Sequence, residues 1–268
     1  MPNKLKLRVV KIGGNILDNP QRLEAFLARF AALHGPKILV HGGGKLATQL
    51  AEQLGIPQTM VDGRRITDAE TLRIAVMVYG GLVNKQIVAQ LQALGIPALG
   101  LSGADGDLIR AHKRKHTSID YGWVGDIETV NAALLDRFLG QGLTPVISPL
   151  SHDGQGQILN TNADTIAQEI AQAMSPAFYV ELIYSFEKSG VLLDVQDEES
   201  RIAQLDWIRY QQLRTDQVIT AGMIPKLDNA FSALQKGVRK VIIGQAEQLE
   251  KLIDGEAGTS IVLEDGLR

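Results

Sequence analysis

Short apolar runs alternate with amphipathic segments along almost the whole chain of 268 residues. The runs of strand length are LKLRVVKI (5–12), KILVH (37–41), IPALGL (96–101), TPVISPL (144–150), FYVELIYSF (178–186) and VRKVIIG (238–244). Most of the segments between them have helical periodicity. This repeated order of strand and helix predicts an α/β fold, an open αβα sandwich around a mostly parallel central sheet.

Local signals mark where helices begin and bend. Asn19 precedes a proline and suits the N-cap of the first long helix. Thr67 and Glu70 form a capping-box pattern ahead of a long helical region at 72–94. The glycine pair at 80–81 is expected to bend that region.

Two features interrupt the alternation. Residues 119–130, IDYGWVGDIETV, alternate apolar and polar positions around glycines and predict a β-hairpin set on the parallel core. Near Ser175 the series of apolar and helical segments is interrupted, and it then resumes. This interruption predicts a larger N-terminal lobe, residues 1–174, and a smaller C-terminal lobe, residues 175–268.

Composition and charge exclude several classes of protein. The chain has 27 Lys plus Arg against 30 Asp plus Glu, a net charge of −3 and no long basic run, which argues against binding to nucleic acid. Because it has no cysteine, disulfides, thiolate nucleophiles and cysteine metal sites are excluded. Lys6, Arg8 and Lys11 interrupt the first apolar run, which is therefore too charged for a signal peptide or a membrane span. We expect a cytoplasmic protein with no membrane partner.

The stretch ILVHGGGKLATQL (38–50) runs from a predicted strand through three glycines directly into a predicted helix. Such a junction suits a phosphate, because glycine backbone approaches an anion closely and the first N–H groups of a helix point outward. The stretch also fits G-x-G-x-x-A with Asp62 about 20 residues further on, a dinucleotide fingerprint, and HGGG is found in esterase oxyanion loops. Asp62 does not end a clear strand and G-x-S-x-G is absent, which leaves a phosphate site or a plain tight turn.

A second glycine turn favours the phosphate site. Lys11 stands at the end of the first predicted strand, and Gly13 and Gly14 follow it. In an open α/β sheet, ligands bind at the carboxyl ends of the strands, so both turns would serve one anion. Neither the Walker A pattern nor the glycine-rich loop of protein kinases occurs, so an ATP site here belongs to another lineage.

Five stretches occur in the order and spacing of a known family: VVKIGGNIL (9–17), VHGGGKLATQL (40–50), GRRIT (63–67), LNTNADTIA (159–167) and ITAGMIPK (219–226). Over nearly its whole length the chain resembles the N-acetylglutamate kinases of the amino acid kinase family. The resemblance implies transfer of the γ-phosphoryl group of ATP, bound with Mg²⁺, to the side-chain carboxylate of N-acetyl-L-glutamate in arginine biosynthesis. It also implies that the N-terminal lobe binds the acyl amino acid and dimerises, and that the C-terminal lobe binds ATP.

The resemblance assigns catalytic roles to three charged residues. Lys11 and Lys226 would stabilise charge on the transferring phosphoryl group, and Asp164 would hold both ammonium groups in place. Taken alone, Lys226 also fits a solvated helix position, and Asp164 also fits an acidic residue in the first turn of a helix.

The resemblance assigns the remaining site residues to the two substrates. Substrate-binding residues would be Gly43 and Gly44 through their amides, Arg65 on the α-carboxylate and Asn160 on the amide. The spacing leaves Asn162 as an alternative helix cap, with Asn160 pointing into the site. The nucleotide-binding residues would be Gly13, Gly14, Glu187, Gly190, Val218, Ile219 and Thr220.

Magnesium is expected to arrive with ATP, held largely by phosphate oxygens rather than by protein ligands. Of the five histidines, only His112 and His116 have a spacing that suits a metal, in the charged stretch HKRKH. We therefore expect no metal site built by the chain itself.

Several departures leave alternatives open. Relatives commonly carry T-D-V-x-G where this chain has FEKSG (186–190), and T-D-G-M where it has Ala221, which leaves base and ribose recognition undefined. Arg64 beside Arg65 favours, as an alternative substrate, N-succinyl-L-glutamate with its extra carboxylate. A non-catalytic regulatory protein of the same fold is a further alternative.

By analogy with the family, we expect a homodimer formed through the helical region at 68–94, without inhibition by arginine.

Overall fold

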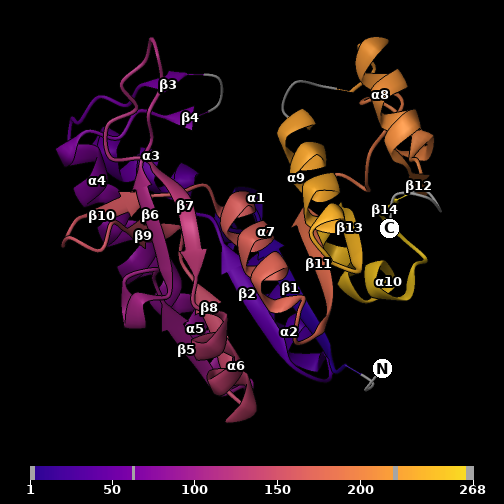
Figure 1. Cartoon of the computed structure of the whole chain (residues 1–268), viewed down its shortest axis with the longest axis horizontal. Helices are drawn as coiled ribbons and strands as arrows, with labels where there is room; N and C mark the ends of the chain where they lie inside the picture. Colours follow the sequence, from indigo (N-terminus) through magenta and orange to yellow (C-terminus); the bar gives the residue numbers. More distant parts are fainter. Residues whose placement is uncertain (1–3, 62–63, 220–222, 264–268) are drawn as a thin grey trace.

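The computed structural model describes residues 4–61, 64–219 and 223–263. A central sheet of eight strands has the order β12-β14-β13-β11-β1-β2-β8-β5 (Figure 1). The neighbouring strands pair in parallel except β13 with β14, which confirms the mostly parallel sheet. The strands are β1 (Lys6–Ile12), β2 (Lys37–His41), β5 (Ala98–Leu101), β8 (Thr144–Ile147), β11 (Tyr179–Phe186), β12 (Gln204–Leu205), β13 (Lys240–Gln245) and β14 (Thr259–Ile261).

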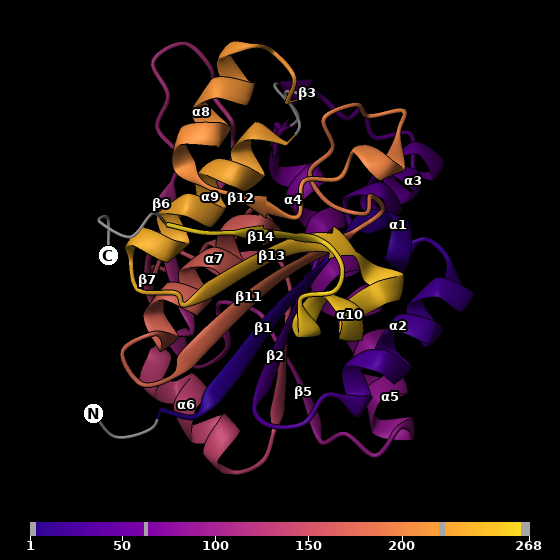
Figure 2. The same ribbon diagram turned by 90° about the vertical axis from the view of Figure 1, so that its right-hand side faces the viewer.

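Helices cover both faces of the sheet, as Figure 2 shows, which confirms the αβα sandwich. One face carries α1 (Gly14–Leu17), α2 (Pro20–Ala32), α3 (Gly44–Gln53), α4 (Ala69–Ala75), the π-helical segment η1 (Val76–Val83), α5 (Asn84–Ala93) and α10 (Leu249–Asp254). The other carries α6 (Ala132–Gly140), α7 (Ala163–Met174), α8 (Trp207–Thr215) and α9 (Ile224–Gln235). Short 3₁₀ turns are η2 (Asp105–Asp107), η3 (Glu198–Ser200) and η4 (Ala246–Gln248).

Side-chain alternation along β1 divides the core into two layers. Leu7 and Val9 pack in the layer under α7 and α9, whereas Val10 and Ile12 pack in the layer under α2 and α5. Successive side chains of a strand point to opposite faces, so Lys11 shares the face of Val9. Lys11 therefore points toward α7 and α9.

Of the two helix N-caps predicted from the sequence, one is observed and one is not. Asn19 accepts a hydrogen bond from the Arg22 N–H, as predicted for an N-cap. The predicted cap at Thr67 is wrong, because Asp68 accepts from the Thr71 N–H instead. Thr67 is extended and shares backbone hydrogen bonds with the segment 121–123.

A second sheet has the order β10-β9-β6-β7, from β6 (Ile109–Lys113), β7 (Gly125–Val130), β9 (Leu150–His152) and β10 (Ile158–Asn160). The hairpin predicted at 119–130 is wider than expected. Only residues 125–130 form a strand, and their antiparallel partner is β6, because residues 121–123 instead bond to the segment around Thr67. A small hairpin joins β3 (Met60–Val61) to β4 (Arg64–Arg65).

The helix Ala69–Ala93 has the length and apolar composition of a membrane span, and 44% of its most apolar window is buried inside the protein. Tyr79 and Ile87, for example, belong to the core under the sheet. The central sheet is continuous across the predicted lobe boundary, since β1 pairs with both β2 and β11.

Candidate active site

The two glycine turns lie side by side at the carboxyl edge of the central sheet. Ile12 at the end of β1 is in register with His41 at the end of β2. The Gly42 N–H donates to the Ile12 carbonyl at 3.2 Å. Gly13 precedes α1 and Gly43 precedes α3, so two helices begin at this edge. The predicted convergence of the two turns is therefore observed.

The three charged residues form one cluster at this edge. The Lys11 Nζ lies 2.7 Å from Asp164 Oδ1, and the Lys226 Nζ contacts Asp164 Oδ2. Asp164 lies in the first turn of α7 and Lys226 in the first turn of α9, and each helix leads into a parallel strand of the sheet. Both helices therefore begin at the carboxyl edge, where Lys11 ends its strand.

Burial and charge oppose each other in this cluster. Burial alone would raise the pKa of Asp164, but the two ammonium groups outweigh it and hold that pKa well below its usual range. Burial lowers the pKa of Lys11, and the carboxylate of Asp164 opposes this shift. One carboxylate thus keeps two lysines close together in a site that is shielded from water.

Arg65 lies beside the glycine triplet. Its Nη2 donates to the Gly44 carbonyl and to Thr48 Oγ1, each at 2.8 Å, and its Nη1 donates to Gln58. The sequence reasoning missed Thr48 and Gln58, although Thr48 lies one helical turn after Gly44 in the quoted stretch. Three donors of the guanidinium are engaged, and two remain for a ligand.

The two asparagines of NTNAD divide their roles as the spacing suggested. Asn162 caps α7, because its side chain accepts from the N–H groups of Asp164 and Thr165. Asn160 ends β10 and donates from Nδ2 to Thr67 Oγ1 at 3.0 Å. Thr67, which the sequence reasoning placed at a helix cap, therefore orients a predicted substrate ligand.

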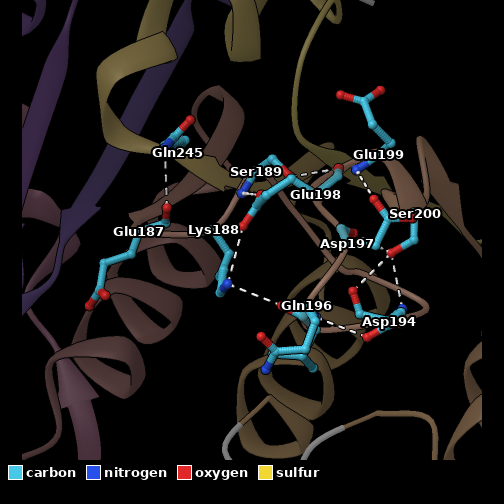
Figure 3. Close-up of polar contacts among 11 residues, drawn as sticks. Glu187, Lys188, Ser189, Asp194, Gln196, Asp197, Glu198, Glu199, Ser200 and Gln245 are labelled. Atoms are coloured by element: carbon cyan, nitrogen blue, oxygen red, sulfur yellow. Dashed lines mark hydrogen bonds and ion pairs between the residues drawn. The ribbon is translucent and has the colours of Figure 1, made fainter.

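The loop after β11 is organised by Glu198 (Figure 3). Its carboxylate accepts from the Lys188 Nζ and from the Ser189 N–H, each at 3.1 Å. The Lys188 Nζ also donates to the Val195 carbonyl. Glu187 is exposed, its carbonyl accepts from Gln245, and its carboxylate points away from the other residues drawn. Lys188 therefore stands on the inner side of this loop and Glu187 on the outer side.

A cavity of about 60 Å³ lies under the same loop. It gathers three predicted nucleotide residues, Gly190, Val218 and Ile219. The rest of its lining is Lys188, Val191, Leu192, Val195 and Met223. The lining is mostly apolar, and Lys188 is its one charged side chain. Thr220, Ala221 and Asp62 lie outside the described residues, and so does the side chain of Arg64.

A basic hollow of about 460 Å³ lies between β6 and β7, lined by residues 113–120. Its lining includes the cations Lys113, Arg114 and Lys115, together with His116. The residues that follow this segment lie beside Asn160, because the Trp123 N–H donates to the Thr67 carbonyl and the Trp123 carbonyl accepts from the Asn160 N–H. The segment that lines the hollow therefore leads directly to the neighbours of Asn160.

The chain is similar in sequence and in fold to known proteins. The acetylglutamate kinase of Cytophaga hutchinsonii is 54% identical over 96% of this chain and 98% of its own, and that of Methanopyrus kandleri is 39% identical over 93% and 98%. An N-acetylglutamate synthase of Neisseria gonorrhoeae, solved with coenzyme A and N-acetyl-glutamate, shares the fold with a TM-score of 0.82 at 21% identity, over 97% of this chain and 60% of its own. The sequence model of the amino acid kinase family matches residues 6–245, so the chain belongs to the amino acid kinase family.

Proposed function

We propose that this protein transfers the γ-phosphoryl group of ATP to the side-chain carboxylate of N-acetyl-L-glutamate, the activity named for its similar relatives. One observation carries the proposal. The carboxylate of Asp164 holds the ammonium groups of Lys11 and Lys226 together beside two glycine turns. Two fixed cations and a set of backbone amides are what a phosphoryl group in transfer requires.

The chemistry of the acceptor explains why lysines and glycines would be sufficient for catalysis. A carboxylate nucleophile is already ionised at neutral pH, so no general base is needed. The barrier then falls through positioning and through neutralisation of charge on the phosphoryl oxygens. Lys11 reaches that charge from β1 and Lys226 from α9, while Asp164 holds both amines in position.

The acceptor side has groups that fit an N-acyl amino acid. Arg65 suits the α-carboxylate through its positive charge, and its two remaining N–H groups, on Nε and Nη1, can each donate a single hydrogen bond. The Nδ2 of Asn160 is engaged by Thr67, so its Oδ1 is turned to accept the N–H of the acyl amide. The N-terminal lobe, residues 1–174, would therefore hold the acyl amino acid.

The C-terminal lobe, residues 175–268, would hold ATP, with the base against the apolar side chains of Val191, Val218 and Ile219. Both oxygens of Asp164 are engaged by lysines, so this carboxylate does not fit a magnesium ligand. Magnesium would instead be held by ATP phosphate oxygens and water, where it neutralises phosphate charge.

The second candidate acceptor is N-succinyl-L-glutamate, and the basic hollow at residues 113–120 favours it. A succinyl group adds a carboxylate, which is costly to bury without a cation or water. Lys113 is paired with Asp120 and Arg114 with Asp126. An extra carboxylate would therefore have to compete with these acidic partners, which keeps N-acetyl-L-glutamate as the first choice.

The protein would work as a homodimer. Met77 and Leu82 on the helix Ala69–Ala93 are half exposed, at 50% and 49%, and would form the centre of a homodimer interface. The protein would work in the cytoplasm, where ATP is available.

The experiment measures ADP release with ATP, Mg²⁺ and, in turn, N-acetyl-L-glutamate, N-succinyl-L-glutamate and free glutamate. An acyl phosphate product is trapped as a hydroxamate. We expect the highest kcat/KM for the acetyl compound. A higher value for the succinyl compound would change the acceptor and keep the kinase. Absence of turnover in a folded protein that binds ATP would favour the non-catalytic regulatory alternative.

A further inference from the structure

The long helix Ala69–Ala93 changes its geometry where it passes behind the glycine triplet. In the π-helical segment η1, a backbone N–H bonds to the carbonyl five residues earlier, whereas in an α-helix it bonds to the carbonyl four residues earlier. The Asn84 N–H accordingly bonds to the Tyr79 carbonyl. In an α-helix, at about 100° per residue, positions five apart point about 140° away from each other. The π-helical turn instead stacks Tyr79 and Asn84 on one side of the helix.

Tyr79 packs against the glycine triplet, and Asn84 bonds to the residue that precedes the triplet. A Cβ atom built on Gly43 would lie 2.8 Å from Cδ1 of Tyr79 and 3.7 Å from Cγ2 of Val83. Gly43 has a φ of +149°, so this position requires glycine for its conformation and for its space. Asn84 Nδ2 forms a hydrogen bond of 3.2 Å with His41 Nε2, and His41 immediately precedes the triplet.

The carbonyls of Val146 and Gly42, at the two ends of this hydrogen-bond chain, determine which groups donate and which accept. Asn84 Nδ2 also donates to the Val146 carbonyl at 3.0 Å, so the nitrogen of the amide faces His41. His41 Nε2 is therefore the acceptor, and the proton lies on Nδ1, which donates to the Gly42 carbonyl at 2.7 Å. Burial lowers the pKa of His41 to about 4, which keeps the ring neutral at physiological pH.

Every carbonyl of the triplet is engaged by a different group. The Gly42 carbonyl accepts from His41, the Gly43 carbonyl from the Ala47 N–H, and the Gly44 carbonyl from Arg65. Within the described residues, no acceptor bonds to the N–H groups of Gly43 and Gly44. The carbonyls are thus turned inward, which leaves these two amides for a ligand.

We propose that His41 and Asn84 are positioning residues for phosphoryl transfer, which fix the Gly42 carbonyl so that the Gly43 and Gly44 amides face the reacting groups. This inference rests on the proposed kinase function, in which those amides stabilise the acceptor and the phosphoryl oxygens. The π-helical turn is the structural cause, because it presents Asn84 to His41 while Tyr79 supports Gly43. Neither His41 nor Asn84 touches the substrates in this account.

The variants separate the two hydrogen bonds of His41. In His41→Asn, the amide nitrogen replaces Nδ1, which keeps the donor to Gly42 and loses the acceptor for Asn84. In His41→Gln, the amide oxygen reaches toward Asn84, and the donor to Gly42 is lost. Asn84→Ala removes the support from the helix. The matched control is Ser148→Ala, which removes the buried hydrogen bond from the Ser148 hydroxyl to the Leu101 carbonyl without touching the triplet.

Two measurements are made on each folded variant: steady-state kinetics, and hydrogen exchange of the peptide 38–50 without substrates. We expect His41→Gln and Asn84→Ala to lower kcat about tenfold or more, with KM changed less than about threefold, since the amides act mainly in the transition state. His41→Asn should retain more activity than His41→Gln. Exchange in the peptide should quicken in His41→Gln and Asn84→Ala and stay unchanged in Ser148→Ala.

The outcomes distinguish this inference from the proposed function. If wild-type protein shows no turnover while exchange changes as expected, the kinase proposal fails and the support of the triplet stands. If turnover is normal in the wild type and His41→Gln behaves like Ser148→Ala in kinetics and exchange, the inference is overturned. Equal losses in His41→Asn and His41→Gln would also overturn it, because the donor to Gly42 would then have no special role.

Discussion

Two ammonium groups share one carboxylate in this site, and this sharing predicts how single substitutions will act. Lys11→Ala and Lys226→Ala should each lower kcat by roughly 10²–10³, with smaller changes in KM, because each lysine neutralises charge that grows in the transition state. Arg65→Ala is the matched comparison. It should mainly raise KM for the acyl amino acid, because in the proposed function Arg65 would bind a carboxylate whose charge is the same before and during transfer. Steady-state kinetics separates these effects, and an unchanged kcat in Lys226→Ala would contradict the role of that lysine.

The lowered pKa of Asp164 predicts a pH dependence of folding stability. The folded protein keeps this carboxylate charged at a pH where the unfolded chain, with a pKa near 4, binds a proton. The stability that the carboxylate contributes is therefore present above about pH 4 and is lost as the pH falls through the lowered pKa.

Asp164→Asn should consequently be much less stable than the wild type at pH 7, and the gap should shrink between about pH 5 and pH 3. Urea unfolding at several pH values measures the free energy of unfolding of both proteins. The exposed Asp136→Asn serves as the control and should show no such convergence. A gap that stays constant with pH would refute the assignment.

At the scale of elements, the end of α2 depends on a lysine from the next strand. The Lys37 Nζ donates to the carbonyls of Phe30, Ala31 and Leu33 at 3.0, 2.8 and 2.7 Å. The last carbonyls of a helix have no partner within the helix, so this amine caps them.

Lys37→Met keeps the length of the side chain and removes the three donors. It should lower the free energy of unfolding by about 2–3 kcal/mol, the range for hydrogen bonds from a charged group. Lys251→Met, at an exposed position of α10, is the control and should change stability by less than about 0.5 kcal/mol. Urea denaturation at pH 7 gives both values, and equal losses would rule out the cap.

At the scale of the whole molecule, the helix Ala69–Ala93 connects the site to the proposed dimer interface. Met77 and Leu82 are five positions apart, so the π-helical turn that pairs Tyr79 with Asn84 also brings these exposed side chains to one side. Leu82→Glu should give a monomer in sedimentation velocity, because it places a charge in the centre of an apolar contact. Ile208→Glu, on α8 at 65% exposure, should leave the dimer intact. A wild-type monomer or hexamer would contradict the proposed assembly.

Local patterns in the sequence predicted the layers of the fold and the two glycine turns of the candidate site. Alternating apolar runs and amphipathic segments predicted the αβα sandwich, because the period of a hydrophobic pattern reports which face of an element is buried. The glycine turns were also readable, since a strand that runs through glycines into a helix is a local feature. The grouping of Lys11, Asp164 and Lys226 came from the resemblance to the amino acid kinase family.

Contacts between segments that are distant in the chain set which groups meet. Thr67 fitted a helix cap locally, yet pairing with residues 121–123 extends it, so Asp68 caps the helix and Thr67 orients Asn160. The hairpin partner of β7 and the π-helical turn behind Gly43 were likewise not predicted. Periodicity specifies the buried face of each element but carries no information on its neighbour. The neighbour is chosen by hydrogen bonds and packing between segments that are distant in the chain.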